Sequence, residues 1–267
     1  MNNTRKNLVV AENIHKKLFS RLEPIGGRVL FLVPAFNFDN AVVVNDALEG
    51  AGIVALISKN YPSAEALAED VIKSKEELGV VSIALGGGDF AQAEQVLNAS
   101  LLSKPDHINV PFELASYAQG RLEQAGLMNV LVNALVLEAE DENQVAITVD
   151  PNHEDRNVIL EIRDAVSIIY GWGIKSVKAV FGKKALNFDW LANIARAAET
   201  VGLELIEPSS GINLDNVNEV IYTCLEHGSA LLLPHVFSPL IDKRTGLTKP
   251  EDVRMLVDRI KRSIDQL

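Results

Sequence analysis

The chain has 267 residues, an apolar fraction of 48% and a formal net charge of −11 at pH 7. This negative charge disfavours binding to a nucleic-acid backbone or an anionic membrane surface, because both are negative themselves. The single cysteine, Cys224, excludes an internal disulfide and a cysteine-based metal cluster. The N-terminus is too polar for a signal peptide, and no run of about 18 apolar residues occurs. We therefore expect a soluble cytoplasmic protein.

The first segment predicts a helix ahead of the first strand. Residues 6–22 are amphipathic, with apolar residues spaced along one face at Leu8, Val9, Ile14, Leu18 and Leu22. We expect residues 1–24 to form a helical extension, which would cap the bottom of a barrel or contact a partner subunit.

Short apolar segments then alternate with helical segments to the end of the chain. The predicted strands begin at Arg28, Ile53, Val81, His107, Val130, Lys175, Leu203 and Ala230. Parallel strands need a crossover helix between them, and eight such strands can close into a ring. The pattern therefore predicts an α/β protein with a (β/α)8 TIM barrel. Such barrels run to about 250 residues as one unit, so we expect residues 1–267 to form a single domain.

One interval, between Val130 and Lys175, is much longer than the others. It contains the apolar run 145–149, which predicts an extra strand or hairpin between strands five and six, followed by a helix at 158–170. An open doubly wound sheet is the alternative fold. No G-x-G-x-x-G follows the first strand, which disfavours that alternative.

Lys178 lies within the β-branched segment 175–180, an unusual place for an ammonium group. In a barrel mouth, desolvation and a nearby cation would lower the pKa of this amine and make it nucleophilic. The hypothesis is that Lys178 forms a Schiff base. The alternative is a side chain that extends to the rim and pairs with a carboxylate.

Active sites of such barrels lie at the C-terminal ends of the strands, and polar residues are frequent there. The candidates are Lys59, Asn60, Asp89, Asn109, Asn133, Lys178, Glu207, Ser209, Ser210, Gly211, His235 and Ser238. Asn109 and Asn133 are alternatively core amides, His235 a structural histidine and Asp89 a helix cap.

Two loops offer backbone N–H groups. Small residues and two hydroxyls in the loop 207–216 favour a phosphate site, with an ordinary β-to-α loop as the alternative. Residues 86–88 are three glycines, which form either a tight turn or a close approach of N–H groups to an anion.

Seven segments, in the same order, resemble the 2-dehydro-3-deoxy-phosphogluconate aldolases of bacterial glucosaminate degradation. They are SKNYP (58–62), LGGGD (85–89), HINVPF (107–112), VNALV (132–136), SVK (176–178), EPSSGI (207–212) and PHVFSPLIDKRTG (234–246). The resemblance runs from about Arg28 to the C-terminus. It implies a TIM barrel that acts as a class I aldolase, in which a lysine forms a Schiff base with the pyruvate carbonyl and neither metal nor cofactor is needed.

The resemblance also assigns residues. The lysine of the family's SxKYFP segment matches Lys178, its EPTGGI loop matches 207–212, and its PHxYSSIIDK segment matches 234–243. This chain differs at Ala179-Val180-Phe181, at Ser209-Ser210, where the family has Thr-Gly, and at Pro239, where it has Ser. These differences leave the exact substrate open.

The implied substrate is a small 2-keto-3-deoxy sugar acid, which we expect to be phosphorylated and which is cleaved to pyruvate and an aldehyde. Glu207 is then the first choice for the general acid/base and His235 the second. The remaining candidates would bind substrate. Asn109 and Asn133 would orient it, and Lys59 would attract its carboxylate or phosphate and help to lower the pKa of Lys178. Ser209, Ser210, Gly211 and Ser238 would hold the phosphate, and Asn60 and Asp89 are further substrate-binding candidates.

Two other functions remain possible on the residues alone. A phosphosugar isomerase or phosphosugar-binding barrel would use Lys178 only as a cation, and a scaffold protein would retain a pocket without activity. A homo-oligomer is expected in each case, because the added helix and apolar-rich helices offer contact surfaces.

Overall fold

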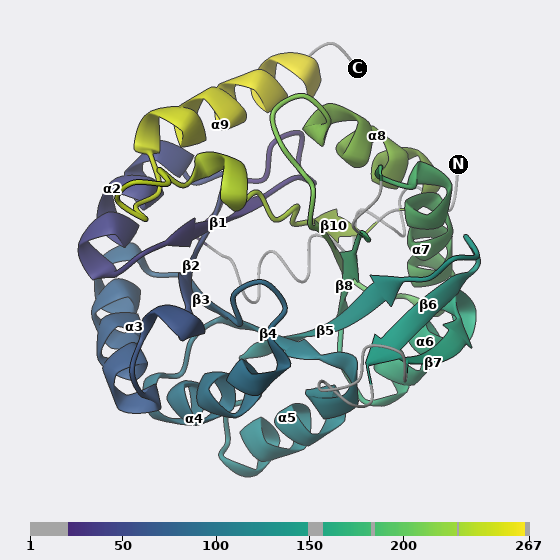
Figure 1. Cartoon of the computed structure of the whole chain (residues 1–267), viewed down its shortest axis with the longest axis horizontal. Coiled ribbons are helices and arrows are strands. Elements are labelled where there is room, and N and C mark those ends of the chain that lie inside the picture. Colours follow the sequence, from purple (N-terminus) through teal and green to yellow (C-terminus); the bar gives the residue numbers. More distant parts are fainter. Residues whose placement is uncertain (1–20, 149–156, 183–184, 229, 265–267) are drawn as a thin grey trace.

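The computed structural model describes residues 21–148, 157–182, 185–228 and 230–264. Within these residues, eight parallel strands form a barrel surrounded by helices (Figure 1). The barrel strands, in order around the sheet, are β1 (Phe31–Ala35), β2 (Gly52–Ile57), β3 (Val81–Ala84), β4 (His107–Pro111), β5 (Leu131–Glu138), β8 (Ser176–Val180), β9 (Leu205–Ser209) and β10 (Leu231–Leu232). The structure confirms the (β/α)8 prediction and excludes the open sheet.

The ring closes between the last strand and the first. Isolated parallel bridges pair Val29 with Leu232 and Leu32 with His235. Backbone N–H groups of Leu30 and Leu32 donate to the carbonyls of Leu232 and Pro234. Closure leaves the barrel without a free edge and puts all strand C-termini at one end.

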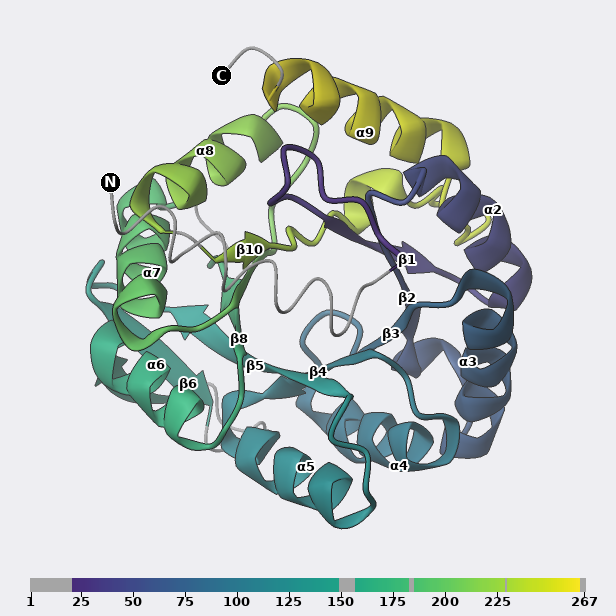
Figure 2. The ribbon, with the colours of Figure 1, turned by 180° about the vertical axis from the view of Figure 1, so that it is seen from behind.

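Helices cover the outside of the barrel on all sides, as the views from both ends show (Figures 1 and 2). They are α2 (Phe38–Leu48), α3 (Ala64–Leu78), α4 (Ala93–Ser103), α5 (Phe112–Gln124), α6 (Ile162–Gly171), α7 (Phe188–Val201), α8 (Val217–His227) and α9 (Pro250–Ile264). Their buried faces pack on the outward side chains of the strands in one large apolar cluster. None of the described helices is long and apolar enough to cross a membrane.

The predicted hairpin between the fifth and sixth barrel strands is confirmed, but it is longer than expected. Antiparallel strands β6 (Gln144–Thr148) and β7 (Asn157–Glu161) extend from the end of β5. The predicted helix at 158–170 therefore begins too early, because residues up to Glu161 pair with β6 and α6 begins at Ile162. β-Branched Val158 and Ile159 favour this extended pairing.

The predicted N-terminal helix falls largely outside the described residues. Its last residue, Leu22, is described and lies outside any helix. Leu22 is buried against the apolar residues that fill the lower barrel, including Leu32 and Ile53. This apolar layer forms the floor beneath the site.

Candidate active site

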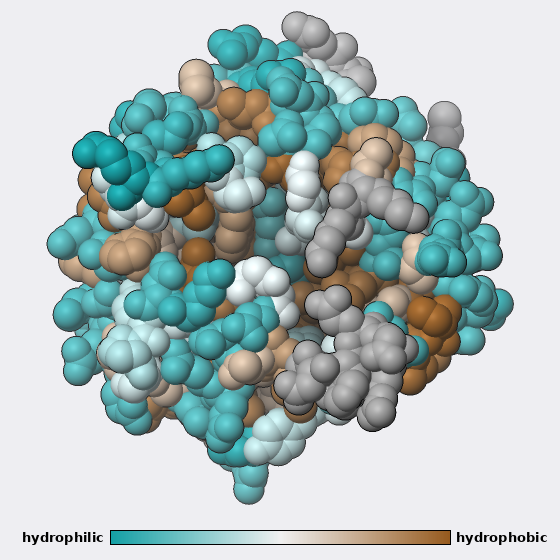
Figure 3. All heavy atoms as spheres, in the orientation of Figure 1, coloured by the Kyte–Doolittle hydropathy of each residue, from teal (hydrophilic) through white to brown (hydrophobic). Residues whose placement is uncertain are grey.

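A pocket of about 720 Å³ occupies the C-terminal mouth of the barrel. Figure 3 shows this face hollowed near its centre. Eight of the predicted site residues line the pocket: Lys59, Asn60, Lys178, Ser209, Ser210, Gly211, His235 and Ser238. Among the other predicted residues, Asp89, Asn109, Asn133 and Glu207 do not line it.

Lys178 is in the middle of β8, and its side chain points into the barrel rather than to the rim. It is only 7% exposed, and no described residue forms a hydrogen bond or an ion pair with its Nζ. Burial lowers the pKa of Lys178 to about 8, and the carboxylate of Glu207 on the adjacent strand opposes this shift. An appreciable fraction of this amine is therefore neutral near physiological pH.

Glu207 is fully buried below the pocket and accepts three hydrogen bonds. Its Oε1 lies 2.9 Å from His107 Nε2 and 2.8 Å from Ser176 Oγ, and its Oε2 lies 2.7 Å from His235 Nε2. Burial alone would raise the pKa of Glu207, but the two histidines outweigh it and lower the pKa to about 2. The carboxylate is thus an anion that only accepts, so both Nε2 atoms carry hydrogen.

His235 is held between this anion and the pocket. Burial and the charge of Lys178 lower the pKa of His235 to about 3, although Glu207 acts in the opposite direction. The ring is therefore neutral, with its hydrogen on Nε2 and a lone pair on Nδ1. Nδ1 is buried and has no hydrogen-bond partner among the described residues. The ring also stacks on Phe237, with centroids 5.5 Å apart.

The predicted amides Asn109 and Asn133 form a buried chain beneath the pocket. Asn133 Nδ2 lies 2.9 Å from Asn109 Oδ1, and Ser176 Oγ lies 2.8 Å from Asn133 Oδ1. Ser176 has one hydrogen but faces two acceptors, Asn133 and Glu207. Reversing both amides resolves this conflict, because Asn133 then donates to Ser176 and Ser176 donates to Glu207. This series of hydrogen bonds therefore helps to hold the carboxylate of Glu207 in place.

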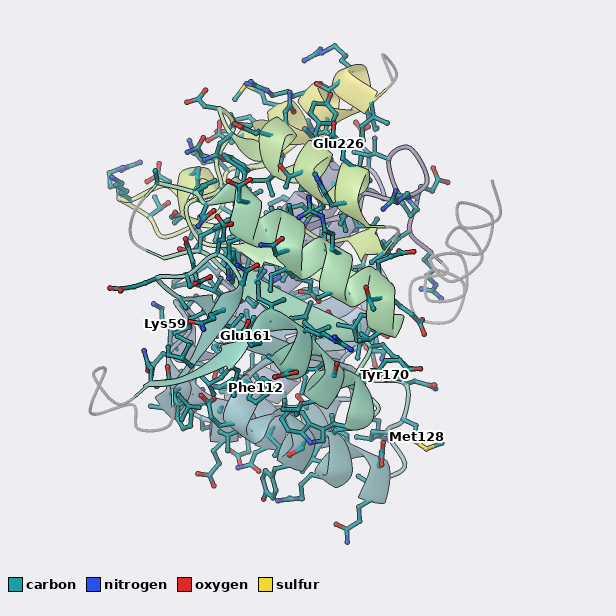
Figure 4. All side chains as sticks on the ribbon, turned by 90° about the vertical axis from the view of Figure 1, so that its right-hand side faces the viewer. Lys59, Phe112, Met128, Glu161, Tyr170 and Glu226 are labelled. Atoms are coloured by element: carbon teal, nitrogen blue, oxygen red, sulfur yellow. The ribbon has the colours of Figure 1, made fainter. Side chains whose placement is uncertain are left out.

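Lys59 reaches the pocket from the short 3-10 helix η1 (Ser58–Asn60), which follows β2. A Cβ at Gly86 would come within 2.7 Å of the side chains of Ile57 and Lys59, so the glycine lets the lysine stem cross the loop. All three residues from Gly86 to Gly88 have positive φ. Figure 4 shows Lys59 at one end of the barrel, with Met128 and Tyr170 toward the other.

Asp89 follows the glycine run but is turned away from the pocket. Its Oδ1 accepts a hydrogen bond from the Ala91 backbone N–H at 3.0 Å, at the start of η2 (Phe90–Gln92). Asp89 is exposed and accepts a hydrogen bond from a nearby backbone N–H, which fits the alternative interpretation of this residue as a helix cap.

The loop after β9 lies on the next wall of the pocket. Ser210 and Gly211 have φ values of 73° and 68°, in the left-handed region. The serine is thus at a position that glycine adopts without steric cost, and it retains a hydroxyl there. Ser238, in η3 (Ser238–Leu240), reaches the pocket beside this loop.

Part of the pocket wall was not predicted from the sequence. Ile241, Gly246 and Thr248 line it from the segment between η3 and α9, together with Phe36 at the end of β1. Ile241 and Gly246 belong to the segment 234–246 that resembles the aldolase family, and residues 245–248 have a Thr-Gly-x-Thr pattern. Neither signal says which strand end the segment covers.

The fold and the pocket define a TIM-barrel protein with a buried amine at its mouth. The family model described as KDGP aldolase matches residues 25–244. The chain belongs to the KDGP aldolase family and is a carbon–carbon lyase. It is 31% identical, over 88% of this chain and 95% of the relative, to a 2-dehydro-3-deoxy-phosphogluconate aldolase of Salmonella typhimurium (strain 14028s / SGSC 2262).

Solved structures of low identity share the fold. The N-(5'-phosphoribosyl)anthranilate isomerase of Pyrococcus furiosus has a TM-score of 0.58 and 15% identity, over 88% of this chain and 99% of that one. KGPDC of Streptococcus mutans has a TM-score of 0.54 and 11% identity, over 88% and 98%. These similarities support the barrel alone.

Proposed function

We propose that this protein is a class I aldolase that cleaves a phosphorylated 2-keto-3-deoxy sugar acid to pyruvate and an aldehyde. The observation that carries the proposal is the Lys178 amine, which is buried in the pocket, unpaired among the described residues and lowered in pKa to about 8. The relative named as a 2-dehydro-3-deoxy-phosphogluconate aldolase supports the substrate class.

The reaction begins when the neutral Nζ of Lys178 attacks the C2 carbonyl of the substrate. Loss of water gives a protonated imine, which serves as an electron sink. Cleavage of the C3–C4 bond sends its electron pair into a new C2=C3 bond, and the C=N pair moves to nitrogen. The product on the lysine is a neutral enamine, so the enzyme avoids a free enolate.

His235 is the general base in this proposal. Its Nδ1 has a free lone pair at the pocket, where it takes the proton of the C4 hydroxyl as the C4 carbonyl forms. The positive charge on the lysine nitrogen disappears in the same step. Since that charge is one cause of the low pKa of His235, the ring becomes more basic when it must accept the proton.

Glu207 is a positioning residue rather than the base. All three of its hydrogen-bond donors are protein groups, and it does not line the pocket, whereas His235 does. It fixes the hydrogen of His235 on Nε2 and stabilises the imidazolium that forms. This reverses the order of the two candidates expected from the sequence.

The charged ends of the substrate have donors on two walls of the pocket. Lys59 and the N–H groups of residues 86–88 offer one anion site, and Ser209, Ser210, Gly211 and Ser238 offer the other. We assign the phosphate to the serine loop, because loops after the seventh and eighth strands of such barrels commonly hold phosphate. Lys59 and Asn60 then bind near the carboxylate.

Borohydride trapping tests the proposal. The protein is incubated with pyruvate, reduced, digested and analysed by mass spectrometry, and the pyruvate adduct is expected on Lys178. Lys175→Met is the matched control, since Lys175 lies close in sequence but its Nζ lies over the ring of Tyr170, 4.4 Å from the centroid. The control should trap normally, whereas Lys178→Met should not. An adduct on another lysine, or none, refutes the proposal.

A further inference from the structure

The segment between η3 and α9 is a compact loop that covers the end of β1. Asp242 N donates to the Leu247 carbonyl at 2.9 Å, and Gly246 N donates to the Asp242 carbonyl at 2.8 Å. Ile241 and Thr248 form an antiparallel bridge at its base. The loop is therefore ordered by its own backbone and contributes a fixed wall to the pocket.

One side chain, Asn40 on α2, holds this wall in place. Its Nδ2 donates to the Thr248 carbonyl, and its Oδ1 accepts from the Thr248 N–H, each at 3.0 Å. Oδ1 also accepts from Phe36 N at 3.1 Å. Both backbone polar groups of Thr248 are thus satisfied by one amide, which leaves the side chain of Thr248 in a defined position.

The hydroxyl of Thr248 has no such partner. The residue is 2% exposed, it lines the pocket, and its Oγ1 forms no hydrogen bond with any described residue. Leaving a buried hydroxyl unsatisfied is destabilising, and valine would fill the same shape without that cost. The hydroxyl is therefore explained best by a partner that enters the pocket.

The chemistry of the substrate class indicates which group this partner is. A neutral hydroxyl that both donates and accepts suits another hydroxyl, whereas the anionic groups have Lys59 and the two N–H-rich loops. The pyruvate half carries only a keto group and a carboxylate, so the hydroxyls belong to the aldehyde half. Thr248 is next to β1, as is His235, which bridges to Leu32 and receives the C4 proton in the proposed reaction.

We propose that Thr248 binds a hydroxyl of the aldehyde half of the substrate and that Asn40 is its positioning residue. This inference rests on the proposed aldolase function, and it adds a residue that determines how well the aldehyde binds. It predicts that replacing Thr248 slows the reaction of the enamine with the aldehyde but leaves formation of the pyruvate imine unchanged.

Kinetics in the condensation direction test it, with pyruvate and D-glyceraldehyde 3-phosphate as the two substrates. Thr248→Val should lower kcat/KM for the aldehyde about tenfold, a typical effect of losing one hydrogen bond. The KM for pyruvate and the extent of borohydride trapping should not change. Thr248→Ser keeps the hydroxyl and should stay close to wild type.

Melting temperature separates binding from a structural role. Thr248→Val removes an unsatisfied hydroxyl and should leave the melting temperature unchanged or higher. Ser74→Ala is the matched control, because Ser74 on α3 also has a buried hydroxyl without a described partner but does not line the pocket. It should change no kinetic constant. A valine variant with wild-type aldehyde kinetics, or with equal losses for both substrates, overturns the inference.

Asn40→Asp tests the positioning role, since it retains an acceptor but loses the N–H that holds the Thr248 carbonyl. It should lower kcat/KM for the aldehyde in the wild-type background and have little further effect on it in Thr248→Val. Additive losses overturn the role of Asn40. Failure of wild-type protein to trap pyruvate would refute the aldolase function itself, whereas normal trapping with an inert Thr248 refutes only this inference.

Discussion

The interior of the barrel has two unlike sectors. On β1 and β2 the inward side chains are apolar, including Leu32, Ile53 and Ala55, and they pack into the floor. From β3 round to the segment after β10 the interior has apolar floor residues as well, such as Leu131, Leu205 and Leu231. Above them it carries polar side chains: Ser82, His107, Asn109, Asn133, Ser176, Lys178, Glu207 and His235. The first sector supplies apolar packing and an apolar part of the pocket wall at Pro34, Ala35 and Ile57, whereas the second pairs most of its polar atoms and leaves a few free.

The buried polar atoms that have no hydrogen-bond partner are the informative ones. Within the described residues, the polar sector satisfies Glu207 three times but leaves Lys178 Nζ, His235 Nδ1 and one amide atom of Asn109 without hydrogen-bond partners. Lys178 and His235 line the pocket, whereas Asn109 does not. A buried polar sector is costly to maintain, and its unpaired atoms at the pocket are the groups to which the proposed reaction gives a role. Substitutions in the polar sector and in the loop after β9 test this difference between the two sectors.

Replacing Lys178 should have the largest effect. Lys178→Met should abolish aldolase activity, by at least about a thousandfold, because no imine forms. It should also stabilise the protein below pH 8. The unfolded amine keeps its proton up to about pH 10.5, so the wild-type penalty is full below pH 8 and falls between pH 8 and 10.5.

That stability gain is at most about 3.4 kcal/mol, which corresponds to lowering the pKa of the amine from 10.5 to about 8. Urea unfolding at pH 7 and pH 10 measures it. A variant that is less stable than wild type at pH 7 would contradict the idea that this amine is buried at a cost.

Replacing His235 should have the second-largest effect on activity. Glutamine can still donate an N–H to Glu207 but lacks the lone pair of Nδ1, so His235→Gln should lower kcat about 10²- to 10⁴-fold. Pyruvate trapping on Lys178 should persist, because it does not need that base. Unchanged cleavage by this variant would show that another group removes the C4 proton.

Replacing Glu207 should have a smaller effect on the chemistry, and one that acts through its neighbours. Glu207→Gln should lower kcat by about 10- to 100-fold through loss of the fixed His235 tautomer. Removing the anion should also lower the pKa of Lys178 below 8, since Glu207 opposes the effect of burial. The pH dependence of pyruvate trapping measures this shift, and a shift to higher pH would argue against the network.

The smallest effect is expected at Ser210, where a non-glycine residue has a φ of 73°. Ser210→Gly should stabilise the protein by about 0.5–1 kcal/mol by relieving this conformation. If the hydroxyl binds phosphate as proposed, the KM for the phosphorylated substrate should rise in the same variant. A stability gain with no change in KM would remove Ser210 from the site.

The sequence predicted the barrel because its β/α period is regular, and it made Lys178 a candidate because a lysine among β-branched residues is unusual. It did not predict which polar strand residues reach the pocket. Asn133 and Glu207 lie on the two strands next to that of Lys178, and Asn109 lies one strand further. Only the stagger between these strands decides which of the side chains reaches the pocket. Periodicity within one strand does not contain that information.

The other features that the sequence did not predict have the same kind of cause. Val158 and Ile159 fit a helical pattern, but their pairing with β6 depends on a partner elsewhere in the chain. Thr248 reaches the pocket because Asn40, 208 positions earlier in the sequence, fixes its backbone. Contacts of this range cannot be inferred from local residue patterns.

The most direct test of the account is the rate of pyruvate trapping on Lys178 as a function of pH. The account predicts that the rate rises with a midpoint near pH 8 and levels off above it, since only the neutral amine attacks the ketone. A midpoint near 10.5, the value of an ordinary lysine, or labelling that does not involve Lys178, would contradict the claim that a buried and unpaired amine carries the reaction.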